Sequence, residues 1–313
     1  MNLPSPTQPG EPGQSSRCAG HLAGRDDQRP GNEPGSRSRR GPDSEGRSRD
    51  EGSSARRAGL PGELARRPGA DLGQATWPEC DAHEPPVVLV PTGSLEQHGP
   101  HLPLDVDTRV ATAVAHAVAE CLDGPALVAP AVNYGASGEH EAFAGTVSIG
   151  SQGLRLLLVE LGRSACRWAG AVVFVNGHGG NAAALVSAVT LLRAEGRRVA
   201  WAACATGGDA HAGFTETSLM LALDPALVRT EAARPGNTTP IRELMPALRE
   251  GGVAGVSPNG VLGDPGGASA DHGRVLLDQL VADITRQVEV FDVGADGRLR
   301  AGNSSPTSPA DAA

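Results

Sequence analysis

Short apolar segments alternate with longer amphipathic ones through this chain of 313 residues, and this alternation restricts the fold more than any other feature. The short segments are rich in Val, Leu and Ala and bounded by Gly or Pro, which predicts buried strands at Val87–Pro91, Leu127–Val132, Val172–Asn176 and Val199–Cys204. The longer segments predict helices at Thr108–Leu122, Gly153–Trp168, Ala182–Glu195, Glu216–Ala222 and His272–Val290. Strands that alternate with helices form βαβ units, so we expect an α/β fold with a largely parallel sheet.

The predicted domain does not include the ends of the chain. Residues 1–84 mix Gly, Pro, Ser, Arg and acidic residues without a hydrophobic period, so we expect a disordered tail there. Residues 85–300 hold the apolar segments and suffice for one large core, whereas residues 301–313 predict a second disordered tail. No apolar run approaches the roughly 20 residues of a membrane span, and the N-terminus lacks an apolar signal, so we expect a cytoplasmic protein without membrane contact.

The charged residues exclude several function classes. All 27 basic residues are Arg, and the absence of Lys excludes Schiff-base catalysis, attachment of pyridoxal phosphate and a P-loop. Residues 85–313 carry 15 Arg against 23 Asp and Glu, and such an acidic domain is a poor partner for nucleic acid. The five Cys are odd in number and lack C-x-x-C spacing, so we expect free, mostly buried thiols.

The loop after the first predicted strand, from Pro91 to Thr108, is the richest in potential ligands. Glu96 and His98 are two residues apart, so in an extended segment both side chains lie on one face, where they could bind a metal. The alternative is a solvated pair. Asp107 is either a further ligand or the N-cap of the next helix.

Two further loops offer one imidazole each at the expected carboxyl edge of the sheet. His178 lies within N-G-H-G-G, a loop that could also cradle a phosphate, although the chain lacks Lys and a G-x-G-x-x-G pattern there. His211 and Glu216 precede a short apolar helix, and the helix dipole alone would favour a carboxylate at Glu216.

The loop from Asn133 to Gly150 is expected to be a wall that faces the substrate and not part of a metal site. It contains Glu139, His140 and Glu141. Among the aromatic residues, Tyr134, Phe143, Trp168 and Trp201 could line a substrate cleft, but core packing is the preferred interpretation for the two Trp.

The expected ligand set consists of three carboxylates and two imidazoles: Glu96, His98, Asp107, His178 and Glu216. Such oxygen and nitrogen ligands suit Zn²⁺, Mn²⁺ or Fe²⁺. Five ligands exceed the need of one open catalytic ion, whereas two ions that share a carboxylate would use all of them. Because such a pair activates water at neutral pH and polarises an amide carbonyl, we expect hydrolysis of a C–N bond.

The same loops resemble the creatininase family of dinuclear metal amidohydrolases. The matching blocks, in family order, are G-S-L-E-Q-H-G-P-H-L-P-L-D-V-D-T (93–108), G-E-H-E-A-F-A-G-T (138–146), N-G-H-G-G-N (176–181) and H-A-G-F-T-E-T-S (211–218). The resemblance implies a three-layer α/β/α sandwich, a homo-oligomer and two divalent ions. It places Glu96 and His178 on one ion, His98 and Glu216 on the other, and Asp107 between them.

One departure from creatininase itself bears on the substrate. Creatininase carries a carboxylate just after the His of the N-G-H loop, where this chain has Gly179 and Gly180, so Glu216 must complete the second ion site. Creatinine is therefore not the expected substrate. The blocks N-Y-G-A-S-G-E-H and G-T-V-S-I-G instead resemble the family's peptidases of mycofactocin biosynthesis, which implies a modified precursor peptide as substrate and release of its C-terminal Val-Tyr-derived piece.

The proton carrier and two alternative functions remain open at this point. His211 or Glu139 could carry a proton to the leaving amine, and His211 could equally serve to orient Glu216. A small-molecule amidohydrolase or deformylase that acts on a cyclic amide or formamide would use the same ions. A scaffold protein that binds metal only in order to fold would need closed coordination without room for water.

Overall fold

A single parallel sheet forms the centre of the computed structural model, which describes residues 70–81 and 84–301. Its five strands lie in the order β1-β3-β2-β4-β5. The strands are β1 (Ala70–Asp71), β2 (Val87–Thr92), β3 (Ala126–Val128), β4 (Ala171–Asn176) and β5 (Val199–Ala203). Every neighbouring pair is parallel, so the carboxyl ends of all strands meet at one edge of the sheet.

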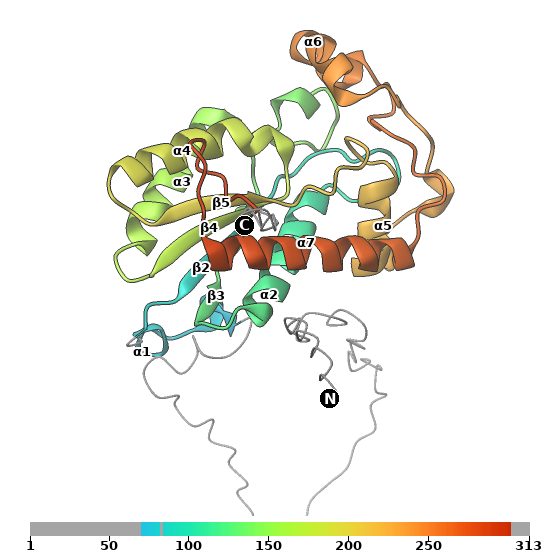
Figure 1. Ribbon diagram of the computed structural model, residues 1–313. Coiled ribbons are helices and arrows are strands. Elements are labelled where there is room, and N and C mark those ends of the chain that lie inside the picture. Colours follow the sequence, from blue (N-terminus) through green and yellow to red (C-terminus); the bar gives the residue numbers. More distant parts are fainter. Residues whose placement is uncertain (1–69, 82–83, 302–313) are drawn as a thin grey trace, which may run out of the picture.

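Helices cover both faces of the sheet (Figure 1). One layer contains α2 (Val106–Cys121), α5 (Phe214–Leu223) and α7 (Ala270–Val290), and the other contains α3 (Gly150–Ala165) and α4 (Ala182–Ala194). Alternate strand residues point to opposite layers, because side chains along a strand have a period of two. Leu89 and Val173 thus pack with α2 and α7, whereas Val90 and Phe174 pack with α3 and α4. The predicted three-layer α/β/α sandwich is confirmed.

The folded region begins before the predicted boundary at residue 85. Ala70 pairs with Leu127 as β1 joins the edge of the sheet, and a short helix, α1 (Trp77–Cys80), follows. Glu79 accepts a hydrogen bond from the backbone N–H of Thr76 at 2.7 Å and completes a capping box. The expectation of disorder is therefore wrong for residues 70–81, because strand pairing and a helix cap use backbone groups and need no hydrophobic period. Residues 1–69 and 302–313 lie outside the described range.

The predicted strands and helices agree with the observed ones to within a few residues. Among the described residues, α6 (Ile241–Gly251) is additional, as are β1 and α1. α6 was not predicted, since Pro246 interrupts its pattern and Leu244 is its one buried residue. It packs through Leu244 against Val253 and Leu262 in a small separate cluster. No helix in the described part of the chain is both long and apolar enough to cross a membrane.

The expectations for Cys and Trp are met in part. Cys80, Cys121, Cys166 and Cys204 are free, as expected, but only Cys121 is buried; Cys18 lies outside the described residues. Trp201 is buried and donates a hydrogen bond from Nε1 to the carbonyl of Asp296 at 3.0 Å. Trp168 is 39% exposed in the turn that follows α3, so its expected core role is wrong.

Candidate active site

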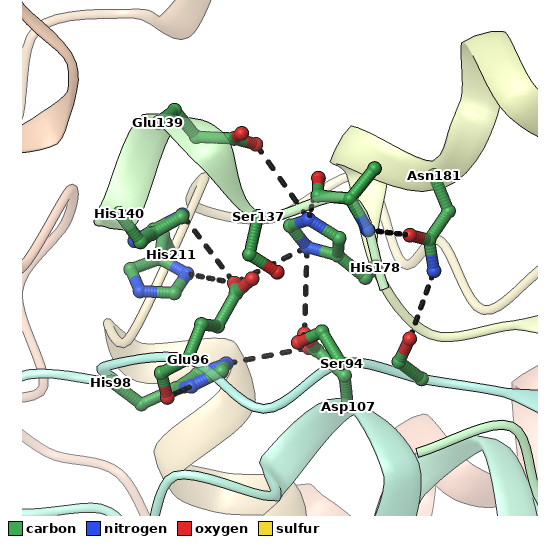
Figure 2. Close-up of polar contacts among 12 residues, drawn as sticks. Ser94, Glu96, His98, Asp107, Ser137, Glu139, His140, His178, Asn181 and His211 are labelled. Carbon is green, nitrogen blue, oxygen red and sulfur yellow. Dashed lines mark hydrogen bonds and ion pairs between the residues drawn. The ribbon is translucent and has the colours of Figure 1, made fainter. Parts of the chain in front are cut away.

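The five predicted ligands meet at the carboxyl edge of the sheet. Figure 2 shows Glu96, His98, Asp107 and His178 directed toward one another. Glu96 and His98 lie in the loop after β2, and Asp107 lies in the first turn of α2. His178 follows β4, and Glu216 lies in the first turn of α5, which follows β5. The parallel topology thus gathers side chains that are up to 120 residues apart in the sequence into one cluster.

Glu96, Asp107 and His178 form one half of the cluster. The Nδ1 atom of His178 lies 3.2 Å from Oε1 of Glu96 and 3.4 Å from Oδ2 of Asp107. On the other side of the ring, Nε2 donates to the carbonyl of Ala136 at 3.1 Å. This hydrogen bond places the proton of a neutral ring on Nε2 and leaves the Nδ1 lone pair facing the two carboxylates.

His98 and Glu216 form the other half, and Asp107 lies between the halves. The Nε2 atom of His98 lies 3.3 Å from Oδ1 of Asp107 and 3.7 Å from Oε2 of Glu216. Its Nδ1 atom donates to the carbonyl of Glu96 at 3.1 Å, so Nε2 presents a lone pair. Asp107 therefore directs one carboxylate oxygen toward each His, which is the arrangement that a bridging ligand requires.

Asp107 is not the N-cap of α2. The residue before the helix is Asp105, and Asp107 is buried in the first turn, where Oδ2 accepts a hydrogen bond from Ser94 Oγ at 2.5 Å. The capping interpretation is wrong because the carboxylate is turned toward the cluster and not back toward the helix N–H groups.

A hydrogen bond from a strained backbone position and a place in the first turn of α5 together orient the Glu216 side chain. Its Oε2 accepts a hydrogen bond from the N–H of Ala212 at 2.6 Å. Ala212 has φ of 52°, a left-handed conformation that is costly for a residue with a Cβ. The Glu216 carboxylate lies at the N-terminus of α5, where the helix dipole stabilises its negative charge. The contact with His98 stabilises the same charge.

Gly177 and Asn181 hold the loops at close range. A Cβ on Gly177 would lie 2.3 Å from the carbonyl oxygen of Asp107, so only glycine allows β4 to approach the start of α2 this closely. Asn181 donates to the carbonyl of Gly93 at 3.0 Å and accepts from the N–H of Ala136 at 2.9 Å. Its side chain thereby joins three loops, a role that its sequence motif did not reveal.

Two more imidazoles lie inside the cluster. His140 is buried, and its Nε2 lies 3.4 Å from Oε1 of Glu96, so this residue of the expected substrate-facing loop reaches the ligand cluster itself. His211 directs Nδ1 toward Oε1 of Glu96 at 3.9 Å and Oε2 of Glu216 at 4.0 Å. The loop after β3 contains His140, and β3 ends at the same edge of the sheet as β2 and β4. The parallel topology therefore already indicated that this imidazole would lie near the ligands. Glu139 lies at the mouth of the site, with Oε1 3.6 Å from Nε2 of His178, and Glu141 is exposed.

The charges of the cluster are set by burial and by mutual attraction. Burial disfavours the charged form of Glu96, but the neighbouring imidazoles of His178, His140 and His98 hold its pKa well below the ordinary value. Burial likewise disfavours imidazolium, but the carboxylates outweigh burial and raise the pKa values of His98 and His178 to about 10. The pocket thus attracts positive charge strongly.

This pocket fits divalent ions. Both carboxylate oxygens of Glu96 are buried, and neither has a hydrogen-bond partner among residues 70–81 and 84–301. A buried carboxylate without a partner is costly, and a cation within bonding distance removes that cost. The donor set of carboxylates and neutral imidazoles is the one that Zn²⁺, Mn²⁺ and Fe²⁺ accept.

Four further groups have pKa values shifted toward their neutral forms: Glu139, His140, His211 and Glu216. Burial raises the pKa of Glu216 to about 7 and also raises the pKa of Glu139. Burial lowers the pKa of His140 to about 4, and burial together with His98 and His140 holds the pKa of His211 well below its ordinary value. At neutral pH the site therefore contains two uncharged imidazoles, which can each donate or accept a hydrogen bond.

The cluster opens into a cleft of about 900 Å³. Asp107, His178 and Glu216 lie at its base, and the glycine-containing loop 204–210 and helix α6 form its walls. α6 presents Ile241, Met245, Leu248, Arg249 and Glu250 to the cleft. The aromatic residues that could have lined it, Tyr134, Phe143, Trp168 and Trp201, are not among the lining residues.

Comparisons with known proteins agree with this geometry. Mycofactocin precursor peptide peptidase of Mycobacterium ulcerans is 52% identical over 252 residues, which cover 78% of this chain and 97% of that protein. The protein of the same name from Mycobacterium tuberculosis is 55% identical over 238 residues, with 73% and 94% covered. Creatinine amidohydrolase of Pseudomonas putida is 30% identical over 255 residues, with 69% and 96% covered.

Solved structures and the family model extend the same relationship. The manganese form of creatininase superposes with a TM-score of 0.61 at 30% identity, covering 70% of this chain and 97% of that one. A mutant creatininase of the zinc–zinc type superposes with a TM-score of 0.60, also at 30% identity, covering the same shares of the two chains. The model for creatininase, described as creatinine amidohydrolase, matches residues 73–288, which include every residue of the cluster. The chain therefore belongs to the creatininase family.

Proposed function

We propose that this protein is a metal-dependent peptidase that hydrolyses the modified mycofactocin precursor peptide and releases its C-terminal Val-Tyr-derived piece. The observation that carries the proposal is the identity of 52–55% to peptidases of that name over 94–97% of their length. The cleft supports it, because about 900 Å³ accommodates several residues of a peptide and far exceeds a small cyclic amide.

We propose two ion sites that share Asp107. Glu96 and His178 would hold one ion and His98 and Glu216 the other. The support is that Asp107 directs Oδ1 toward His98 and Oδ2 toward His178, at 3.3 and 3.4 Å. Zn²⁺, Fe²⁺ and Mn²⁺ all suit this donor set.

Bound ions would polarise the scissile carbonyl and supply a nucleophilic oxygen from water at neutral pH. The protein residues would position the peptide and move protons. Glu139 lines the cleft beside His178, and its raised pKa suits a group that passes a proton to the leaving amine. His211 is farther from both Glu96 and Glu216 than the closer pairs of the cluster, so we assign it to proton exchange or orientation of Glu216 and not to an ion.

The test is mass spectrometry of the modified precursor peptide incubated with metal-loaded protein, with chelator-treated protein and with the loaded variant Glu96→Gln. We expect release of the C-terminal piece by the first sample alone, and its return when Zn²⁺ or Mn²⁺ is added back to the second. Absence of cleavage by fully loaded protein would refute the proposal.

The same samples test the two alternatives. Hydrolysis of a cyclic amide or a formamide, without cleavage of the peptide, would indicate a small-molecule amidohydrolase, the function that the name of the Pseudomonas putida relative carries. Hydrolysis of neither would favour a scaffold. The open cleft argues against the scaffold, because Asp107, His178 and Glu216 all line it and a structural ion site is closed.

We further propose that the protein is a cytoplasmic homo-oligomer. The support for association is that large apolar side chains are exposed on the helices, among them Leu156 at 60% on α3 and Val275 at 53% on α7. Light scattering coupled to size-exclusion chromatography measures the number of subunits, and a monomer at micromolar concentration would contradict the proposal.

A further inference from the structure

Gln97 lies between two predicted ligands but points away from them into the protein. It is 5% exposed, and its amide is oriented by two hydrogen bonds. Oε1 accepts from the N–H of Gly99 at 2.9 Å, and Nε2 donates to the carbonyl of Gly260 at 3.0 Å. An N–H group can only donate and a carbonyl can only accept, so these two contacts determine which end of the amide carries the hydrogens.

The oriented amide determines the protonation of His140. Nε2 of Gln97 lies 2.9 Å from Nδ1 of His140 and 3.0 Å from Nε2 of His211. Nε2 of His211 also lies 2.8 Å from the carbonyl oxygen of Gln97, which can only accept, so that nitrogen carries a proton and cannot accept from the amide. The second amide hydrogen of Gln97 is therefore donated to Nδ1 of His140. Nδ1 must therefore carry a lone pair, and the single proton of the neutral ring is on Nε2. That atom faces Oε1 of Glu96 at 3.4 Å, so His140 presents an N–H to the cluster.

The main-chain carbonyl of Gln97 also places the proton of His211 on Nε2, but in His211 this nitrogen points away from the cluster. Nε2 of His211 lies 2.8 Å from the carbonyl oxygen of Gln97, which can only accept, so the proton of this ring is on Nε2. The lone pair is then on Nδ1, which faces Glu96 and Glu216. His140 and His211 are adjacent, with ring centroids 4.4 Å apart. His140 thus presents an N–H donor to the cluster, whereas His211 presents a lone pair.

We propose that Gln97 is a positioning residue whose side-chain amide keeps His140 as an N–H donor toward the site, and that His140 is not an ion ligand. His140 lies close enough to Glu96 and His211 for the three to hold a cation, but an atom that carries a proton cannot bind one. A fixed, uncharged N–H on a buried ring that lines the cleft stabilises the negative charge that develops on a carbonyl oxygen during amide hydrolysis.

Two substitutions separate orientation from packing. Gln97→Glu keeps the shape but replaces the donor by an acceptor, so the preferred proton position in His140 moves to Nδ1 and Nε2 loses its N–H. Gln97→Met keeps the volume and removes the hydrogen bonds, which leaves the ring without a preferred proton position. Gln152→Glu on α3 is exposed and serves as the matched control.

The first experiment is long-range ¹H–¹⁵N correlation of the metal-free protein labelled with ¹⁵N-histidine, since protonated and unprotonated ring nitrogens have well separated shifts. His140→Gln assigns the signal by its loss. We expect a proton on Nε2 of His140 in the unaltered protein and in Gln152→Glu, and on Nδ1 in Gln97→Glu. A proton on Nδ1 in the unaltered protein would overturn the proposal even if no variant folded.

The second experiment is steady-state cleavage of the precursor peptide, and this part rests on the proposed function. We expect both Gln97 variants to lower kcat at least about tenfold, with KM and bound metal per chain changed less than about threefold. An unchanged kcat despite a moved proton, or loss of metal in proportion to activity, would overturn the positioning role. If the unaltered protein cleaves nothing, the proposed function fails, while the nuclear magnetic resonance result still decides the proton position.

Discussion

Binding of divalent ions to the metal-free protein should release about two protons per chain at pH 8. His98 and His178 have pKa values raised to about 10, so both rings carry a second proton at that pH. Neither ring can bind an ion until that proton leaves. Glu216 has its pKa raised to about 7, so ion binding there releases a small fraction of a proton at pH 8 and about half a proton at pH 7.

Isothermal titration calorimetry with Zn²⁺ or Mn²⁺ in buffers of different ionisation enthalpy measures this number, because the apparent enthalpy changes linearly with the buffer in proportion to the protons released. By linkage, the apparent affinity for each ion should rise about tenfold for each pH unit between 8 and 9, and the product of the two binding constants about 100-fold. His116→Gln, on α2 and paired with Asp71, should leave the proton count unchanged. Water that ionises on binding can only add to the count, so release of fewer than one proton per chain would refute the reasoning.

Further predictions concern stability and turnover. The raised pKa values of His98 and His178 stabilise the metal-free fold fully below about pH 6.5, so urea midpoints of that form should fall as pH rises toward 10, whereas those of the metal-loaded form should not. Glu139→Gln should lower kcat by about 10²–10⁴-fold without loss of bound metal, and an unchanged kcat would exclude it as the proton carrier. Asp107→Asn should reduce bound metal below two ions per chain by atomic absorption, and retention of both would show that Asp107 is not shared. Gly177→Ala should destabilise the metal-free protein by at least about 1–3 kcal/mol in urea unfolding, because its Cβ would meet the Asp107 carbonyl at 2.3 Å, and an unchanged midpoint would contradict the close approach.

The sequence predicted the strands and helices of the sandwich because their signal is local. The apolar run Val172–Val175 and the glycines after it indicate a buried strand and a tight turn, whatever the rest of the chain does. The five candidate ligands were found by the same rule, since residues that follow parallel strands meet at one edge. Where the local signal was weak, the predictions failed: β1 at Ala70–Asp71 depends on pairing with β3, and α6 contains Pro246.

The tertiary structure alone decided how the site is organised. Asp107 had two interpretations in the sequence, and its contacts with Ser94 and the two imidazoles exclude the helix cap and support the proposed shared ligand. The sequence predicted a substrate-facing loop around His140, but nothing local shows that this loop brings the ring to Glu96.

The protonation of His140 is even harder to predict from the sequence. It depends on an amide 43 residues away in the chain, whose orientation in turn depends on Gly260, 163 residues from that amide. By itself the sequence determined the fold class, the family and the residue types at the sheet edge, because these follow from periodicity and from the order of the loops. Which of those residues share an ion, donate a hydrogen bond or only hold another in place depends on distances of a few ångströms between distant segments, and only the folded chain sets these.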